Sequence, residues 1–111
     1  MWLQRSKNKY GNVRAEYNGS SYMSKKEANY AFELDLQVKA KEIKEWRKQV
    51  RVPLKINGVL ICTYVVDFLI THNDDSEEYI EIKGFETKDW KLKYKMFKAL
   101  FPDKKLTVIK K

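Results

Sequence analysis

Two apolar, β-branched runs that each carry an acidic residue constrain the fold of this chain most strongly. Asp67 interrupts the first run, residues 59–70, and the second run, residues 79–84, carries Glu81. The polar stretch between the runs predicts a turn, so the two runs are expected to pair as β-strands. If the hairpin is centred near Asp74, Asp67 faces Glu81 with Cβ atoms about 4.5–5.5 Å apart. A register shift of one residue would separate the two carboxylates.

Two facing carboxylates have a chemical use. An ionised Asp67 inside an apolar strand needs a partner or a metal ion. Carboxylate oxygens are ligands that Mg²⁺ prefers, and the backbone carbonyl of Ile82 could complete the shell. The period of two places Lys83 on the same strand face as Glu81, where its charge could stabilise a phosphoryl group during hydrolysis. The alternative for Asp67 is an internal ion pair with Lys83.

Turn signals, caps and periodicity predict the other elements. Asn18-Gly19 and Asn57-Gly58 are typical two-residue hairpin turns. Ser24 with Glu27 forms a capping-box pattern that opens a helix. Its apolar stripe is expected at i+4 spacing over Ala28, Phe32, Leu36 and Ala40, widened by Ala31, Leu34 and Val38. The expected elements are a hairpin over 12–23, a helix from Ser24 to about residue 40, strands over 48–54, 59–70 and 79–84, a helix over 88–101 after an N-cap at Thr87, and a strand over 106–109.

This order predicts an α/β fold, in which a mixed central β-sheet is flanked by two helices and preceded by an N-terminal β-hairpin. Pro53 assigns its strand to a sheet edge. Residues 1–11 are expected to be a flexible basic arm, and residues 12–111 a single domain.

The distribution of charge favours a polyanionic partner. The net charge is +8, with basic ends on either side of an acidic centre. The expected phosphate contacts are the lysines at the start of the first helix and along one face of the last helix: Lys25, Lys26, Lys88, Lys91, Lys95 and Lys98. A merely solvated lysine face is the alternative. Trp90 and Tyr94 are expected in the core, with base stacking as the alternative.

Other sequence features bear on where the protein works. The single cysteine, Cys62, excludes an intramolecular disulfide and indicates a reducing interior. Without an apolar run long enough to cross a membrane and without a signal-peptide pattern, we expect no membrane association. The expected location is the cytoplasm, that of the host cell if the protein is phage-encoded.

Three motifs together resemble a known superfamily. The runs Val66-Asp67-Phe68 and Glu81-Ile82-Lys83-Gly84, with the upstream helical run Ser24-Lys25-Lys26-Glu27-Ala28, look like the PD-(D/E)XK nuclease superfamily. Much of the chain is similar to small phage-encoded endonucleases of that superfamily, whose related architectures include Holliday-junction resolvases. The resemblance implies a restriction-endonuclease-like core. Val66 stands where the motif's nominal proline would be.

The resemblance also assigns roles to individual residues. It implies that Asp67 and Glu81 bind the metal and that Lys83 is the catalytic lysine. Glu27 would be the acid of the first helix that reaches the site directly or through water, and Gln49 would be an accessory residue. Glu27 has an alternative role as a capping-box partner, and the two roles conflict over the direction of its carboxylate.

These observations predict a Mg²⁺-dependent DNA endonuclease, for which Mn²⁺ may substitute, that hydrolyses phosphodiester bonds in branched or structured DNA during phage replication or recombination. A homodimer is expected, because a domain with one active site must act twice to cut two strands. The alternatives are a non-specific or nicking DNase acting on duplex DNA, a non-catalytic DNA-binding protein with the nuclease fold, and, more weakly, an RNA-directed nuclease.

Overall fold

The chain forms two compact units, residues 1–43 and residues 44–111. The computed structural model describes residues 4–7, 13–22 and 24–110, with the side chains of residues 4–7, 13 and 14 left out. Where the sequence predicted a single domain over residues 12–111, the structure has a boundary between Ile43 and Lys44. Each unit is described by itself.

The first unit combines a small antiparallel sheet with one long helix. Asn18 and Gly19 both have positive φ angles, 52° and 79°, as a two-residue type I′ turn requires. The predicted hairpin is therefore confirmed, with Tyr17 paired to Ser20 across the turn. The described elements of this unit are β1 (Gln4–Lys7), β2 (Val13–Tyr17), β3 (Ser20–Tyr22) and α1 (Lys25–Lys39), and the strand order is β1-β2-β3.

The predicted basic arm contains a strand. Gln4–Lys7 forms β1, which pairs antiparallel with β2 from Gln4 opposite Glu16 to Lys7 opposite Val13. An edge strand is held by backbone hydrogen bonds to its neighbour and can form without an apolar face. The remainder of the arm, residues 1–3 and 8–11, lies outside the described residues.

Helix α1 begins where its cap predicts, but its buried face differs from the predicted stripe. The Ser24 side chain accepts a hydrogen bond from the Glu27 N–H. The helix buries Ala28, Ala31 and Leu34 as predicted, whereas Leu36 is 48% exposed, so the prediction for Leu36 was wrong. Successive i+4 positions turn by about 40° around a helix, and the stripe therefore drifts away from the face that packs on β2.

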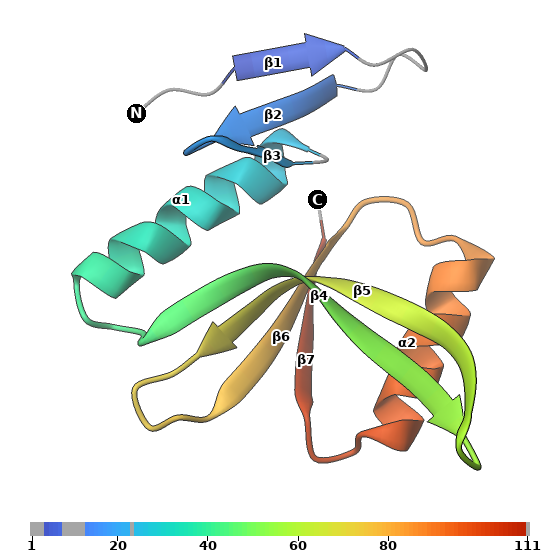
Figure 1. The fold of residues 1–111 in the computed structure, drawn as a ribbon. Helices are drawn as coiled ribbons and strands as arrows, with labels where there is room; N and C mark the ends of the chain where they lie inside the picture. The colour runs from blue at the N-terminus through green and yellow to red at the C-terminus, as the bar shows by residue number, and fades with distance from the viewer. Residues whose placement is uncertain (1–3, 8–12, 23, 111) are drawn as a thin grey trace. The chain divides into compact units, whose positions relative to one another are not determined.

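The second unit is a four-stranded mixed sheet with one described helix on it (Figure 1). Strands β4, β5 and β6 pair antiparallel, and β6 pairs parallel with β7. A parallel neighbour needs a crossover connection, which α2 provides. The elements are β4 (Glu45–Ile56), β5 (Val59–Thr71), β6 (Glu77–Lys83), α2 (Lys88–Leu100) and β7 (Lys105–Lys110). The mixed sheet is thus confirmed, while the place of α1 beside it stays a prediction.

Local signals explain where these elements begin and end. Asn57 and Gly58, with φ angles of 51° and 79°, close the β4–β5 hairpin as predicted. The Thr87 hydroxyl accepts the Trp90 N–H and caps α2. Pro53 lies on β4, which is the edge strand of this sheet. Strand β4 starts earlier than predicted, at Glu45, because its first residues continue the ladder with β5 up to Thr71.

Helix α2 packs on the sheet through aromatic side chains. Phe97 is fully buried and makes edge-to-face contacts with Tyr64 on β5 and Tyr79 on β6, at centroid distances of 5.8 and 5.2 Å. Trp90 is also in this core, as predicted, with 7% of its surface exposed. Over the residues that the structure describes, no helix has the length and apolar character to cross a membrane.

Candidate active site

The β5–β6 hairpin has the register that brings Asp67 and Glu81 together. The ladder runs from Thr71 opposite Glu77 to Phe68 opposite Ile80, which confirms the predicted register. The next positions along the two strands are Asp67 and Glu81. The backbone ladder between β5 and β6 stops before this pair, although β6 continues to pair with β7 up to Lys83.

Side chains replace the backbone ladder at this point. The Asp67 N–H donates to Glu81 Oε1 at 3.2 Å, and the Ile82 N–H donates to Asp67 Oδ2 at 2.8 Å. Each carboxylate is therefore held by the backbone of the opposite strand. These reciprocal bonds satisfy backbone groups that the ladder leaves open and fix both carboxylates beside each other.

Strand β4 has an irregularity at the same level. Its pairing with β5 passes from Lys48 opposite Phe68 to Val50 opposite Val66, so Gln49 occupies the position across from Asp67. Gln49 has a φ of 50°, a left-handed conformation that costs a non-glycine residue about 1–2 kcal/mol. Backbone strain of this kind gathers at functional sites. The structure thus positions the predicted accessory residue opposite Asp67, while its role stays a prediction.

The irregularity changes which side chains of β5 face α2. Val66 and Leu69 both belong to the core cluster beneath α2, although strict alternation would put residues three apart on opposite faces. Phe68, between them, packs edge to face on Trp46. Asp67 therefore lies where the alternation of β5 is broken.

Glu81 is buried against α2 and carries a strongly perturbed pKa. Its side chain is 4% exposed, and its Oε2 accepts a 2.7 Å hydrogen bond from the indole Nε1 of Trp90. Burial, followed by the negative charge of Asp67, raises the pKa of Glu81 from 4.5 to about 7. The same indole nitrogen lies 3.1 Å from the Tyr64 hydroxyl, and burial, then the charge of Glu81, raises the pKa of Tyr64.

Lys83 lies on the same side of β6 as Glu81. Its Nζ is 5.3 Å from the centroid of the Trp90 ring, so one tryptophan contacts both residues of the Glu81-Ile82-Lys83 run. A cation over an aromatic face is attracted by the negative potential of the ring. The predicted shared face of Glu81 and Lys83 is consistent with these contacts to Trp90.

The two carboxylates have a donor chemistry that fits Mg²⁺. Glu81 Oε1 and Oε2 accept the Asp67 and Trp90 N–H groups, Asp67 Oδ2 accepts the Ile82 N–H, and a carboxylate oxygen can accept more than one bond. Burial, followed by the negative charge of Asp67, raises the pKa of Glu81, and a cation beside the pair would favour the ionised form of both carboxylates. In the described part of the chain, no three or more His, Cys, Asp or Glu side chains gather to hold a metal. Mg²⁺ is commonly held by one or two carboxylates together with substrate phosphate and water.

Two other predicted contributors have different outcomes. Glu27 belongs to the first unit, where it is buried and accepts a 3.0 Å hydrogen bond from the Ser24 hydroxyl. Its carboxylate thus takes part in the helix cap, and its catalytic role stays a prediction. Ile82 is buried, with its N–H bonded to Asp67, and metal binding by its carbonyl stays a prediction.

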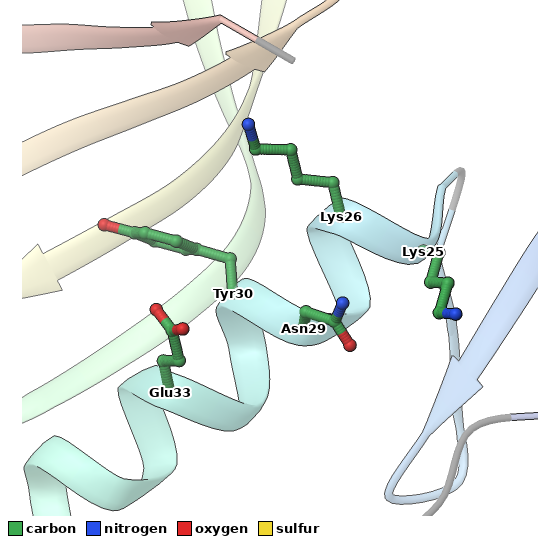
Figure 2. Close-up of a pocket in the computed structure, with 5 residues that line it drawn as sticks. All are labelled: Lys25, Lys26, Asn29, Tyr30 and Glu33. Carbon is green, nitrogen blue, oxygen red and sulfur yellow. The ribbon is translucent and has the colours of Figure 1, made fainter.

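The predicted DNA-contacting lysines are exposed on both helices. On α1, Lys25 and Lys26 line a cavity of about 480 Å³. Figure 2 shows Lys26, Tyr30 and Glu33 extending to the same side of α1, with Lys25 on another side. On α2, Lys91 and Lys95 line a second cavity of about 380 Å³, while Lys98 donates to the Tyr94 hydroxyl at 3.5 Å.

The sequence reasoning missed the part that Trp90 plays in the site. Trp90 was assigned to the core, and its indole in fact joins Glu81, Tyr64 and Lys83. A buried tryptophan usually needs an acceptor for its N–H, and this was the available signal. A buried tryptophan in the sequence indicates that its N–H needs an acceptor. That the acceptor is Glu81 depends on how α2 packs on β6.

Comparison with known proteins gives a family without an assigned activity. A family model described as "Protein of unknown function (DUF1064)" matches residues 7–111, so the chain belongs to this family. No curated protein and no solved structure matches the chain.

Proposed function

We propose that this protein is a Mg²⁺-dependent DNA endonuclease with a restriction-endonuclease-like core. The observation that carries the proposal is the Asp67–Glu81 pair, locked by reciprocal hydrogen bonds where the β5–β6 ladder stops. Lys83 on the Glu81 side of β6 adds a cation. The mixed sheet with its crossover helix supports the fold assignment, as do the motifs that resemble the PD-(D/E)XK superfamily.

Each residue of the site has a task in phosphodiester hydrolysis. Asp67 and Glu81 would hold Mg²⁺, which would supply polarisation of the phosphoryl oxygen and a bound water of lowered pKa. Trp90 holds Glu81 in place through its indole N–H. The Lys83 ammonium stabilises the negative charge that builds up on the phosphoryl oxygens. The oxygen of a water molecule forms a bond to phosphorus as the bond to the leaving sugar oxygen breaks, and the proton that the water loses is matched by one that the leaving oxygen takes up from solvent.

The preferred substrate that we propose is branched or otherwise structured DNA, on the basis of the resemblance to junction-resolving nucleases. The net charge of +8 and the exposed lysines of α2 support a polyanionic substrate. Because one chain offers one such site, a homodimer would supply the second cut on the opposite strand.

A cleavage assay tests the function. Full-length protein is incubated with a four-way junction, a linear duplex and a single strand, in Mg²⁺, in Mn²⁺ and in EDTA. We expect metal-dependent cleavage, fastest on the junction. Equal rates on junction and duplex would instead indicate a non-specific or nicking DNase. If no DNA is cut while gel shifts persist, the protein is a non-catalytic DNA-binding protein.

Two substitutions on one strand test the site. Glu81→Ala and the isosteric Glu81→Gln should abolish cleavage and retain DNA binding, because they remove a metal ligand while leaving the lysines of α2 intact. Glu77→Ala is the matched control, since Glu77 lies on β6 with an exposed side chain, and it should cut at the wild-type rate. Retained cleavage by both Glu81 variants would falsify the site assignment.

A further inference from the structure

A cavity of about 380 Å³ is lined by residues of α2 and β7. Its wall includes Trp90 and Tyr94 from α2 and Val108 from β7. Trp90 also donates to Glu81, so the cavity and the proposed active site share a side chain. The volume lies within the range of about 300–1,000 Å³ that is typical of small-molecule sites.

The wall of the cavity is aromatic. Trp90 and Tyr94 are one helical turn apart, and their rings stack at 5.1 Å with an interplanar angle of 20°. Trp90 is buried and Tyr94 is partly buried, so Tyr94 supplies the accessible part of this aromatic wall, with Lys98 Nζ 5.3 Å from the centroid of its ring. A stacked aromatic surface beside an aliphatic side chain suits a flat aromatic ligand, because every nucleobase has a π-face.

The rim of the cavity is cationic. Lys91 and Lys95, at i and i+4 on α2, both line the cavity and are exposed. Lys110 also lines it, and forms an ion pair with Glu86. The lysine pair supplies positive charge for a phosphate next to the aromatic ring. An aromatic wall with a cationic rim matches the two chemical parts of a nucleotide.

We propose that this cavity takes an unpaired nucleobase of the DNA substrate, with its phosphate held by Lys91 and Lys95, next to the phosphodiester that is cut. The statement that the base lies next to the cut phosphodiester rests on the proposed function. A paired base is stacked inside the duplex and must be extruded at a cost in free energy before it can enter, whereas an unpaired base is already available. The cavity therefore selects DNA that contains an unpaired nucleotide, such as a bulge, a flap or an open junction.

Binding without cleavage tests the proposal directly. Full-length protein in EDTA is titrated into a duplex carrying one unpaired 2-aminopurine, and into the same duplex fully paired. Fluorescence quenching reports stacking of the probe, and anisotropy of an end label reports affinity. Base–aromatic stacking corresponds to about a 5- to 150-fold change in affinity, so we expect quenching and at least about 5-fold tighter binding of the bulged duplex.

Matched variants connect this preference to the cavity. Tyr94→Ala should remove the quenching and the preference while leaving affinity for the paired duplex unchanged. Tyr94→Phe keeps the ring and should behave as wild type. Lys55→Ala is the control for charge, because Lys55 is exposed on β4, does not line the cavity and is not among the expected phosphate contacts. Circular dichroism confirms that each variant is folded.

The outcomes separate this proposal from the proposed function. A preference that survives Tyr94→Ala, or equal affinity of wild type for the two duplexes, overturns the proposal. Binding of free dAMP that depends on Tyr94, without any preference between the duplexes, overturns the assignment to DNA. If Mg²⁺ produces no cleavage but the Tyr94-dependent preference is present, the base-binding cavity stands and the nuclease proposal fails.

Discussion

Without metal, the free energy of unfolding of the wild-type protein should fall as the pH rises, because Glu81 becomes charged. Replacing Glu81 with glutamine should abolish this fall. Burial and the charge of Asp67 raise the pKa of Glu81 to about 7, against an ordinary value of 4.5. At about 1.4 kcal/mol for each pH unit of difference, protonation favours the folded state by about 3 kcal/mol. Glutamine is similar in shape and carries no charge, and its single carbonyl oxygen can accept either the Trp90 N–H or the Asp67 N–H, so one hydrogen bond is lost.

The sign follows from where the proton is bound. Between pH 4.5 and about 7, folded protein keeps a proton on Glu81 that the unfolded chain has released. The free energy of unfolding therefore falls as the pH rises through this window. The stabilising contribution is complete below pH 4.5 and is lost as the pH passes about 7.

Urea unfolding in EDTA, followed by tryptophan fluorescence from about pH 4.5 to about pH 8, measures the effect. At the acid end, Glu81→Gln should be less stable than wild type by about 0.5–1.5 kcal/mol, because it loses one hydrogen bond. At the alkaline end, the variant should be more stable by up to about 3 kcal/mol, or roughly 10 °C in Tm for a chain of this length. The difference between the two proteins isolates Glu81, because all other titrating groups are shared.

Glu78 on the same strand provides a control of opposite sign. Burial raises its pKa, but hydrogen bonds from Thr107 and His72 and the charge of Lys105 outweigh burial and lower the pKa overall. Glu78→Gln should therefore be less stable than wild type above the ordinary pKa of 4.5 and approach wild type as the pH falls. Because Glu78 is partly exposed, its effect should be smaller than that of Glu81.

Metal completes the test. Mg²⁺ at ten times its Kd should stabilise wild type by about 1.4 kcal/mol and should stabilise Glu81→Gln much less. A constant difference between wild type and Glu81→Gln at every pH, or a variant that is less stable at the alkaline end, would refute the reasoning about the pKa of Glu81.

Three further predictions concern binding, a turn and the indole. Lys91→Ala combined with Lys95→Ala should weaken DNA binding. The slope of log affinity against log salt concentration should fall by about one unit for each lost phosphate contact. An unchanged slope would mean that these lysines do not contact DNA phosphates. Gly58→Ala should lower the free energy of unfolding, measured by urea unfolding, by about 1 kcal/mol. The cause is the backbone φ of +79°, because a Cβ at this position meets no atom within 4 Å. Trp90→Phe should lower the free energy of unfolding by about 1.5–3 kcal/mol and raise the pKa of Glu81 further. If the pKa of Glu81 does not change, the indole does not stabilise its carboxylate.

The sequence by itself determined the strand pairing around the carboxylates. A polar turn between two β-branched runs sets the register of a hairpin, and the period of two decides which side chains share a face. Asp67 could therefore be aligned with Glu81 before any coordinates were known, and the ladder has that register. The Asn-Gly turns, and the caps at Ser24 and Thr87, were predictable for the same reason, because each depends on a few neighbouring residues.

Elements that depend on partners elsewhere in the chain were not predictable. Gln4–Lys7 has no apolar alternation of its own, and becomes a strand by pairing with β2. The exposure of Leu36 depends on which face of α1 packs on β2, since periodicity alone allows several neighbouring stripes. The division after Ile43 likewise depends on how contacts are distributed through the chain.

Only the tertiary structure decided how the carboxylate pair is held and what surrounds it. The position of α2 is set by Phe97 against Tyr64 and Tyr79, and this packing brings the Trp90 indole onto Glu81. The left-handed backbone of Gln49 is a further such feature. It lies opposite Asp67, where the pairing of β4 with β5 is interrupted. Sequence patterns specify neighbours within a strand or a turn, whereas these contacts depend on how a helix and separate strands pack in three dimensions.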